Sequence, residues 1–217
     1  NKEKLDDHLQ WIKFSNIAWY RDGFFYSRYK KPGQGKALTQ ANKNHKVYYH
    51  ELGTPQSDDR LVFNKPDHPK RNYSPNVSDD QKYLYIYETR STPGNNVYIK
   101  NLEHDGPFVK LTTGFKYEYE IIDHIGDQMV VRTNYKAPKY KVVIIDIHKR
   151  DVGNWIDLIP EKNNVLSSCE VAEDRIIASY MEDAHSKLEV YNMKGERLYP
   201  VQLPGRGSVN SISAHAK

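Results

Sequence analysis

Histidines, aspartate pairs and one serine-containing segment are the parts of this 217-residue sequence that could carry chemistry. A serine nucleophile of the hydrolase type sits on a sharp turn of the form G-x-S-x-G, and no such segment occurs. The nearest approach, GRGSVN at 205–210, lacks that form. Nine histidines suggest a metal site, but neither H-E-x-x-H nor a pair of cysteines is present. The residues therefore predict no catalytic residue, no metal site and no cofactor in this chain.

Two histidines occur within and just before the segment KVYYHEL. His45 and His50 are five residues apart, so on a strand they point to opposite faces and cannot both bind one ion. We expect them to lie on the surface. Three aspartate pairs fall in predicted turns or at the start of the chain: Asp6–Asp7, Asp58–Asp59 and Asp79–Asp80. Aspartates in turns bond local backbone amides, so we assign these pairs no acid–base role.

The composition limits the classes of partner. The net charge is +4, and 32 basic and 28 acidic residues are interleaved without long runs of one sign, which argues against nucleic-acid binding. One cysteine, Cys169, excludes an intrachain disulfide. No apolar stretch approaches 18 residues, so we expect no membrane partner, and a soluble protein of the cytoplasm or periplasm. Because the chain starts with Asn1 and not with Met, we expect a piece of a longer protein.

A pattern of four strands repeats along the chain, and its most regular members are the second strands. These are predicted at 23–29, 82–89, 128–135 and 175–182. Asp80, Asp127 and Asp174 precede the last three at steps of 47 residues. Third strands are predicted at 46–52, 96–102, 141–147 and 187–193. Fourth strands are predicted at 60–63, 108–112, 154–160 and 197–203. First strands, with smaller residues, are predicted at 15–19, 74–78, 118–123 and 167–172.

Four strands in every 45 to 50 residues are typical of the blades of a β-propeller, in which each sheet is covered by its neighbours. The predicted blades are 14–65, 72–113, 117–161 and 165–204, with 205–217 as the start of a further blade. A β-sandwich with the same number of strands is the alternative. The longer first unit contains a predicted mobile loop at 30–44, whose GQGK segment lacks the strand–loop–helix context of a phosphate-binding loop.

Three segments resemble the propeller domain of the prolyl oligopeptidase family: IKFSNIAWYRDGFFYSRY, KVYYHELGTPQSDDRLVF and HPKRNYSPNVSDDQKYL. The resemblance implies that the chain supplies about four blades of a seven-bladed ring. In this family the propeller caps an α/β-hydrolase domain that holds a Ser-Asp-His triad and cleaves peptides after proline. That domain is absent from this sequence, so we expect the fragment alone to be inactive.

The resemblance also implies three substrate-lining residues. Phe14 in IKFSNIAW matches an aromatic residue at the outer edge of the family's peptide site. A family arginine aligns with Thr89 without a gap or with Arg90 after a one-residue shift, and Arg90 is chosen because a cation can meet a peptide carbonyl or carboxylate. Thr92 stands where the family often has Cys. For Phe14, ordinary packing within a blade is the alternative, and for Arg90 a solvated side chain.

A second departure from the family lies at Arg71-Asn72, where Trp-Met is common, so the wall of the pocket is expected to be more polar here. The expected function is to gate the access of short proline-containing peptides to the hydrolase domain of the same protein. The alternative is a stand-alone propeller that binds a protein or peptide partner. The open faces of the end blades are expected to cause self-association of the fragment.

Overall fold

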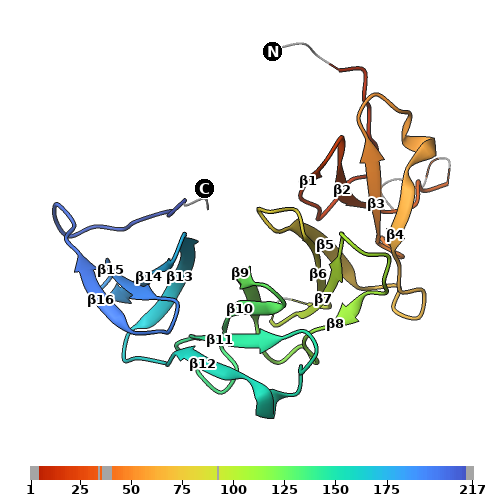
Figure 1. Cartoon of the computed structure of the whole chain (residues 1–217). Coiled ribbons are helices and arrows are strands. Elements are labelled where there is room, and N and C mark those ends of the chain that lie inside the picture. The colour runs from red at the N-terminus through yellow and green to blue at the C-terminus, as the bar shows by residue number, and fades with distance from the viewer. Residues whose placement is uncertain (1–4, 34, 36–40, 92, 214–217) are drawn as a thin grey trace. The chain divides into compact units, whose positions relative to one another are not determined.

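The computed structural model describes residues 5–33, 35, 41–91 and 93–213. These residues form sixteen β-strands and two short 3₁₀ helices, η1 (Gln56–Asp58) and η2 (Val152–Asn154). The strands make four antiparallel sheets of four strands each (Figure 1). The chain divides into two compact units, Asn1–Phe115 and Lys116–Lys217, with two sheets in each. The regular structure is therefore all β, as the sequence predicted.

The first unit contains the first two sheets. The first sheet has the order β1 (Ala18–Tyr20), β2 (Gly23–Arg28), β3 (Lys46–Glu51) and β4 (Arg60–Phe63). The second sheet has the order β5 (Asn72–Val77), β6 (Tyr83–Thr89), β7 (Asn96–Asn101) and β8 (Val109–Lys110). Within each sheet, every strand after the first pairs with the one before it in the chain, because a short turn can join antiparallel neighbours. Residues 34 and 36–40 of the predicted loop at 30–44 lie outside the described residues.

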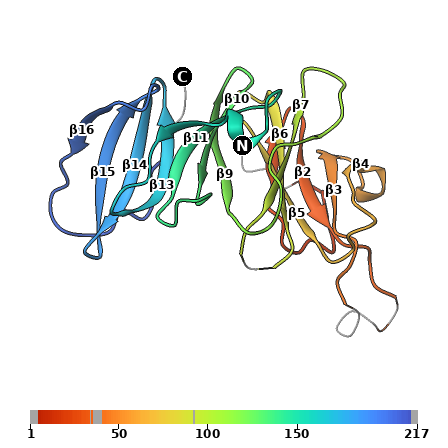
Figure 2. The same ribbon diagram turned by 90° about the horizontal axis from the view of Figure 1, so that it is seen from below.

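The second unit repeats this order twice. The third sheet contains β9 (Tyr119–Ile125), β10 (Gln128–Thr133), β11 (Lys141–Asp146) and β12 (Ile156–Ile159). The fourth sheet contains β13 (Val165–Ala172), β14 (Arg175–Glu182), β15 (His185–Asn192) and β16 (Arg197–Val201), whose strands lie side by side in Figure 2. After β16, the amide of Ser186 donates to the carbonyl of Gly207 at 2.8 Å, so the chain passes the start of β15 again.

Most predicted strands are found within two residues of their expected bounds, and the main differences concern β1 and β8. The first strand begins at Ala18 and not at residue 15, because the side chains before it bond elsewhere. Ser15 Oγ accepts the amide of Ser27 at 2.7 Å, and Asn16 Nδ2 donates to the Pro75 carbonyl at 2.6 Å. The strand predicted at 108–112 is reduced to the two residues of β8.

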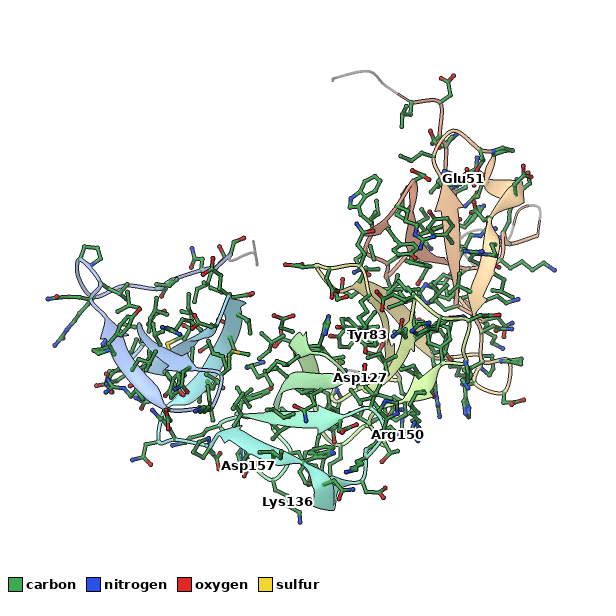
Figure 3. All side chains as sticks on the ribbon, viewed as in Figure 1. Glu51, Tyr83, Asp127, Lys136, Arg150 and Asp157 are labelled. Atoms are coloured by element: carbon green, nitrogen blue, oxygen red, sulfur yellow. The ribbon has the colours of Figure 1, made fainter. Side chains whose placement is uncertain are left out.

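Each unit has an apolar core between its two sheets. In the first unit, the core residues are Ala18, Tyr20, Phe25, Val47 and Phe63 from the first sheet and Tyr73, Leu84, Ile86 and Tyr98 from the second. In the second unit, valine and isoleucine side chains of β10 to β12 pack with residues of β13, β14 and β15. Figure 3 shows how densely side chains cover both faces of each sheet. Face-to-face packing is what a single four-stranded sheet needs in order to bury its apolar residues.

Candidate functional site

The predicted substrate-lining residue Phe14 lies in the segment before β1. It is 66% exposed, and its φ of 54° is the left-handed conformation that bulky residues seldom adopt. Both neighbours are held by hydrogen bonds: the Lys13 carbonyl by His45 Nε2 at 3.0 Å, and Ser15 Oγ by the Ser27 amide at 2.7 Å. The backbone is thus fixed while the ring of Phe14 faces solvent.

Arg90 directly follows β6 and is exposed. Its guanidinium carbon lies 5.3 Å from the centre of the Phe115 ring, and that of Arg71 lies 5.0 Å from the centre of the same ring. Cation–π contacts of this length orient a guanidinium without using its N–H donors. Thr89, the other position that matched the family arginine, is the last residue of β6 and pairs with Asn72 of β5. Arg90 can therefore present its donors to a ligand.

Phe14 and Arg90 lie at the same end of the two sheets of the first unit. His45, which immediately precedes β3, bonds the carbonyl next to Phe14 and accepts the amide of Tyr73 at the start of β5. The start of β5 in turn pairs with the end of β6, which Arg90 follows. This end of the sheets combines an exposed ring with an exposed cation. The third predicted residue, Thr92, lies outside the described residues, and a substrate-lining role for all three stays a prediction.

A buried carboxylate that sequence reasoning missed lies at the same end of β6. Glu88 is fully buried; Arg71 Nη1 donates to its Oε1 at 2.7 Å, and Asn96 Nδ2 donates to its Oε2 at 2.7 Å. The hydroxyl of Tyr98 donates to Oε2 at 3.3 Å. Burial by itself would raise the pKa of Glu88, but the bonds from Arg71 and Asn96 outweigh burial and lower it. The carboxylate therefore fixes Arg71 while remaining charged.

The two positions where this chain departs from the family pattern, Arg71 and Asn72, are both polar side chains with partners. Arg71 is held by Glu88, as above, and Asn72 Oδ1 accepts a hydrogen bond from the hydroxyl of Tyr29. Each of the two side chains thus has a hydrogen-bond partner within the first unit, which explains how polar residues are tolerated there.

His45 is buried, so the prediction that it lies on the surface is wrong. Its Nδ1 accepts the amide of Tyr73 at 2.9 Å, which leaves Nε2 to donate to the Lys13 carbonyl at 3.0 Å. The imidazole also stacks on Tyr29, with 4.4 Å between ring centres. Burial lowers the pKa of His45 to about 4, against the opposing effect of the Lys13 bond. His45 is therefore a neutral cross-link between three segments of the first unit.

His50 is also buried, and it lies between two carboxylates. Its Nδ1 is 2.7 Å from Asp59 Oδ1, and its Nε2 is 2.9 Å from Asp7 Oδ1. Because ionised carboxylates only accept hydrogen bonds, both ring nitrogens donate and the ring is an imidazolium. The Tyr26 hydroxyl also donates to Asp59, and the Gly53 amide donates to Asp7 at 2.7 Å.

This network ties the start of the chain to the end of β3, where Figure 3 labels Glu51. Burial by itself would lower the pKa of His50, but the bonds to Asp59 and Asp7 outweigh burial and raise it. For Asp7 and Asp59 the sequence predicts bonds to local backbone amides, and the structure differs because both carboxylates bond His50, and Asp7 also accepts the distant Gly53 amide. The alternation of KVYYHEL places His50 on the same strand face as Lys46 and Tyr48, which are only half-buried, so this pattern gave no signal for the burial of His50.

The described parts of the chain contain no cluster of three His, Cys, Asp or Glu side chains that could hold a metal ion. In the same residues, no helix has the length and apolarity that crossing a membrane requires. The chemistry that this geometry supports is recognition by hydrogen bonds, cation contacts and ring contacts.

Comparison with known proteins gives a consistent result. The family model for the prolyl oligopeptidase N-terminal β-propeller domain matches residues 1–217. A prolyl endopeptidase of Elizabethkingia meningoseptica is 36% identical over 212 residues, which are 97% of this chain and 30% of that protein. Prolyl oligopeptidase A of Amanita bisporigera is 35% identical over 228 residues, which are 99% of this chain and 29% of that protein.

Solved structures agree. One structure, from an analysis of two prolyl endopeptidases and their inter-domain dynamics, has 33% identity and a TM-score of 0.85 and covers 98% of this chain and 30% of that chain. Prolyl oligopeptidase B from Galerina marginata, bound to a 25-residue macrocyclization substrate, has 31% identity and a TM-score of 0.83 and covers 91% of this chain and 28% of that chain. The chain thus spans about 30% of the length of these relatives. The prediction of propeller-type sheets from this family is confirmed, and the chain belongs to the N-terminal β-propeller domain of the prolyl oligopeptidase family.

Proposed function

We propose that this chain is the propeller part of a serine endopeptidase that cleaves short peptides after proline, and that it gates their access to a hydrolase domain of the same protein. The observation that carries this proposal is the match of the family's propeller model to all 217 residues. The described residues supply strands, exposed recognition groups and buried cross-links, and the hydrolase domain would supply the nucleophile, base and oxyanion donors.

The exposed end of the first unit is the part of the chain that we assign to the peptide. Arg90, oriented by Phe115, would donate to a peptide carbonyl or carboxylate, and Phe14 would cover an apolar side chain of the substrate. Thr92 is proposed as a third lining residue. These contacts act on the peptide away from the bond that is cut, so their loss should raise KM more than it lowers kcat.

The gating part of the proposal rests on a propeller that covers the hydrolase domain. A propeller that covers a hydrolase site admits only chains thin enough to enter, and closing the two domains excludes water and assembles the site. The solved relative with a bound 25-residue peptide supports peptides as the ligand class.

The test uses the full-length protein and two series of substrates. Proline-containing peptides of increasing length should be cleaved up to a size limit, and a folded protein with an exposed proline should resist cleavage. Arg90→Gln and Phe14→Ala should each raise KM by about tenfold, the size of one charged hydrogen bond or one apolar contact, with kcat nearly unchanged. Arg150→Gln, which removes an exposed arginine of the second unit, is the matched control.

Two results would overturn the proposal. Efficient cleavage of the folded protein would contradict gating. Turnover of a proline peptide by the purified 217-residue chain would contradict our assignment of the chemistry to another domain. A full-length protein that binds peptides tightly without cleaving them would favour a propeller that acts as a binding module.

A further inference from the structure

A basic hollow lies beside the end of β2 and the start of β3 in the first unit. Its volume is about 770 Å³, within the range of sites for small molecules. Four cationic side chains line it: Arg28, Lys30, Lys31 and Lys46. Three aromatic side chains form other parts of its wall: Trp11, Tyr29 and Tyr48. Among the described residues that line it, there is no carboxylate.

Two of these cations lie directly opposite one another. Arg28 of β2 and Lys46 of β3 are register partners, so their side chains leave the sheet on the same face. Like charges at opposed positions destabilise a pair of strands. The carboxylate nearest to Arg28 is Asp59, 3.9 Å from Nη2, and Asp59 is already bonded to His50 and Tyr26. The positive charge at this strand end is therefore incompletely balanced within the described part of the chain.

The guanidinium of Arg28 is held in place before any ligand arrives. It lies over the ring of Tyr48, with 4.2 Å from its central carbon to the ring centre, and Nη2 donates to the Gln56 carbonyl at 3.4 Å. No carboxylate of the described residues lies within ion-pair distance of the Lys30, Lys31 or Lys46 ammonium groups. The hollow thus combines one oriented fork of donors with three ammonium groups that have no ion-pair partner in the part of the chain that the structure describes.

We propose that this hollow binds a small molecule that carries more than one phosphate group. Three lysines without a carboxylate partner among the described residues favour a multivalent anion, and the fork of Arg28 matches two oxygens of one phosphate. The rings of Trp11, Tyr29 and Tyr48 provide a wall against which an organic ligand can pack. A bound phosphate would also relieve the repulsion between Arg28 and Lys46. This site is independent of the peptidase proposal, because it is defined by binding alone.

The experiment measures binding of tripolyphosphate, adenosine triphosphate and citrate to the full-length protein by isothermal titration calorimetry at low ionic strength. Tripolyphosphate tests phosphate recognition alone, adenosine triphosphate adds an aromatic group, and citrate carries comparable charge as carboxylates. We expect both phosphate compounds to bind more tightly than citrate. We expect the double variant Lys31→Gln/Lys46→Gln to weaken phosphate binding by at least about tenfold, the size of one charge-assisted hydrogen bond.

The matched control is Lys149→Gln/Lys194→Gln, which removes the same charge from exposed positions of the second unit. Its phosphate affinity should equal that of the wild type. The midpoint of thermal unfolding without ligand is the second readout. Because the Lys46→Gln change in the double variant removes a like-charge pair, the midpoint of the double variant should equal or exceed that of the wild type. An equal loss of affinity in the control, citrate binding as tight as tripolyphosphate, or no heat of binding with either phosphate compound would each overturn the proposal.

Discussion

The substitution Asp59→Asn tests whether the His50 network holds the first sheet together. The Asp59 and His50 side chains are both fully buried, and 2.7 Å separates the bonded oxygen and nitrogen. Removing one partner of a buried ion pair typically costs about 3–5 kcal/mol. Asp7 remains on the other ring nitrogen at 2.9 Å, and Asn keeps one oxygen acceptor for Tyr26, so we expect the lower end, about 3 kcal/mol.

This cost should depend on pH in a defined direction. The pKa of His50 is raised in the folded protein, so its contribution is complete below its unfolded pKa of about 6.5 and is lost as pH rises through the folded value. The pKa of Asp7 is lowered, so its contribution is present above its unfolded value of about 3.9 and is lost as pH falls through the folded value. The network is therefore strongest between about pH 4 and pH 6.5. The effect of Asp59→Asn should be larger at about pH 6 than at about pH 9.

Native-state hydrogen exchange of the full-length protein, read by mass spectrometry, measures this locally. The peptides to follow are those that contain β2 and β3, because Tyr26 and His50 lie on these strands. At about pH 6 the equilibrium constant for opening of these strands should be about a hundredfold larger in the variant than in the wild type, which corresponds to about 3 kcal/mol. Intrinsic exchange rates are corrected for pH before the comparison.

The matched control is Asp58→Asn, because Asp58 is the exposed neighbour in the same turn and its carboxylate accepts a hydrogen bond from the adjacent Ser57 hydroxyl. It should change the opening free energy by less than about 0.5 kcal/mol. Equal exchange in the Asp58 and Asp59 variants, or an Asp59 effect that grows from pH 6 to pH 9, would show that His50 is not held as a buried cation.

Three further outcomes can be measured in the same protein. Glu88→Gln should destabilise the second sheet by about 3 kcal/mol, because it leaves the Arg71 guanidinium without its 2.7 Å carboxylate partner; faster exchange in β6 and β7 would show this, and unchanged exchange would contradict it. Gly23→Ala should cost about 3 kcal/mol, because the added Cβ would lie 2.0 Å from the His50 carbonyl oxygen; a thermal midpoint equal to that of the wild type would refute this clash. Cys169 should not react with a thiol reagent until the protein unfolds, because burial raises its pKa to about 12; rapid labelling of the native protein would count against that burial.

The sequence alone was sufficient for the strands and their order. Three signals can be read along the chain. They are the alternation in KVYYHEL and its counterparts, the short polar turns before each second strand, and the steps of 47 residues between Asp80, Asp127 and Asp174. The observed strands follow them, and β4 (Arg60–Phe63) has the predicted bounds. Differences arose where contacts with another sheet intervened, as at β1, where the Asn16 side chain before the strand bonds the backbone carbonyl of Pro75 in β5.

The tyrosines show a limit of this approach. Their abundance predicted half-buried strands with the ring covered and the hydroxyl in water. In the structure, Tyr26, Tyr73 and Tyr83 are almost completely buried. The Tyr26 hydroxyl donates to Asp59 and not to solvent. Composition indicated the strand, whereas the depth of each ring depended on the sheet that packs against it.

The candidate sites were decided by the tertiary structure. His50 meets Asp7 across 43 positions of sequence, and His45 meets the Tyr73 amide across 28. A pattern of residues along one strand contains no information about which distant carboxylate or amide will lie within 3 Å of it. The protonation of each histidine follows from its surroundings: two carboxylates make His50 a cation, whereas burial keeps His45 neutral and lets its Nδ1 accept the Tyr73 amide. Sequence therefore determined where the chain forms strands, and the packing of the strands determined which side chains became charged, buried or available to a ligand.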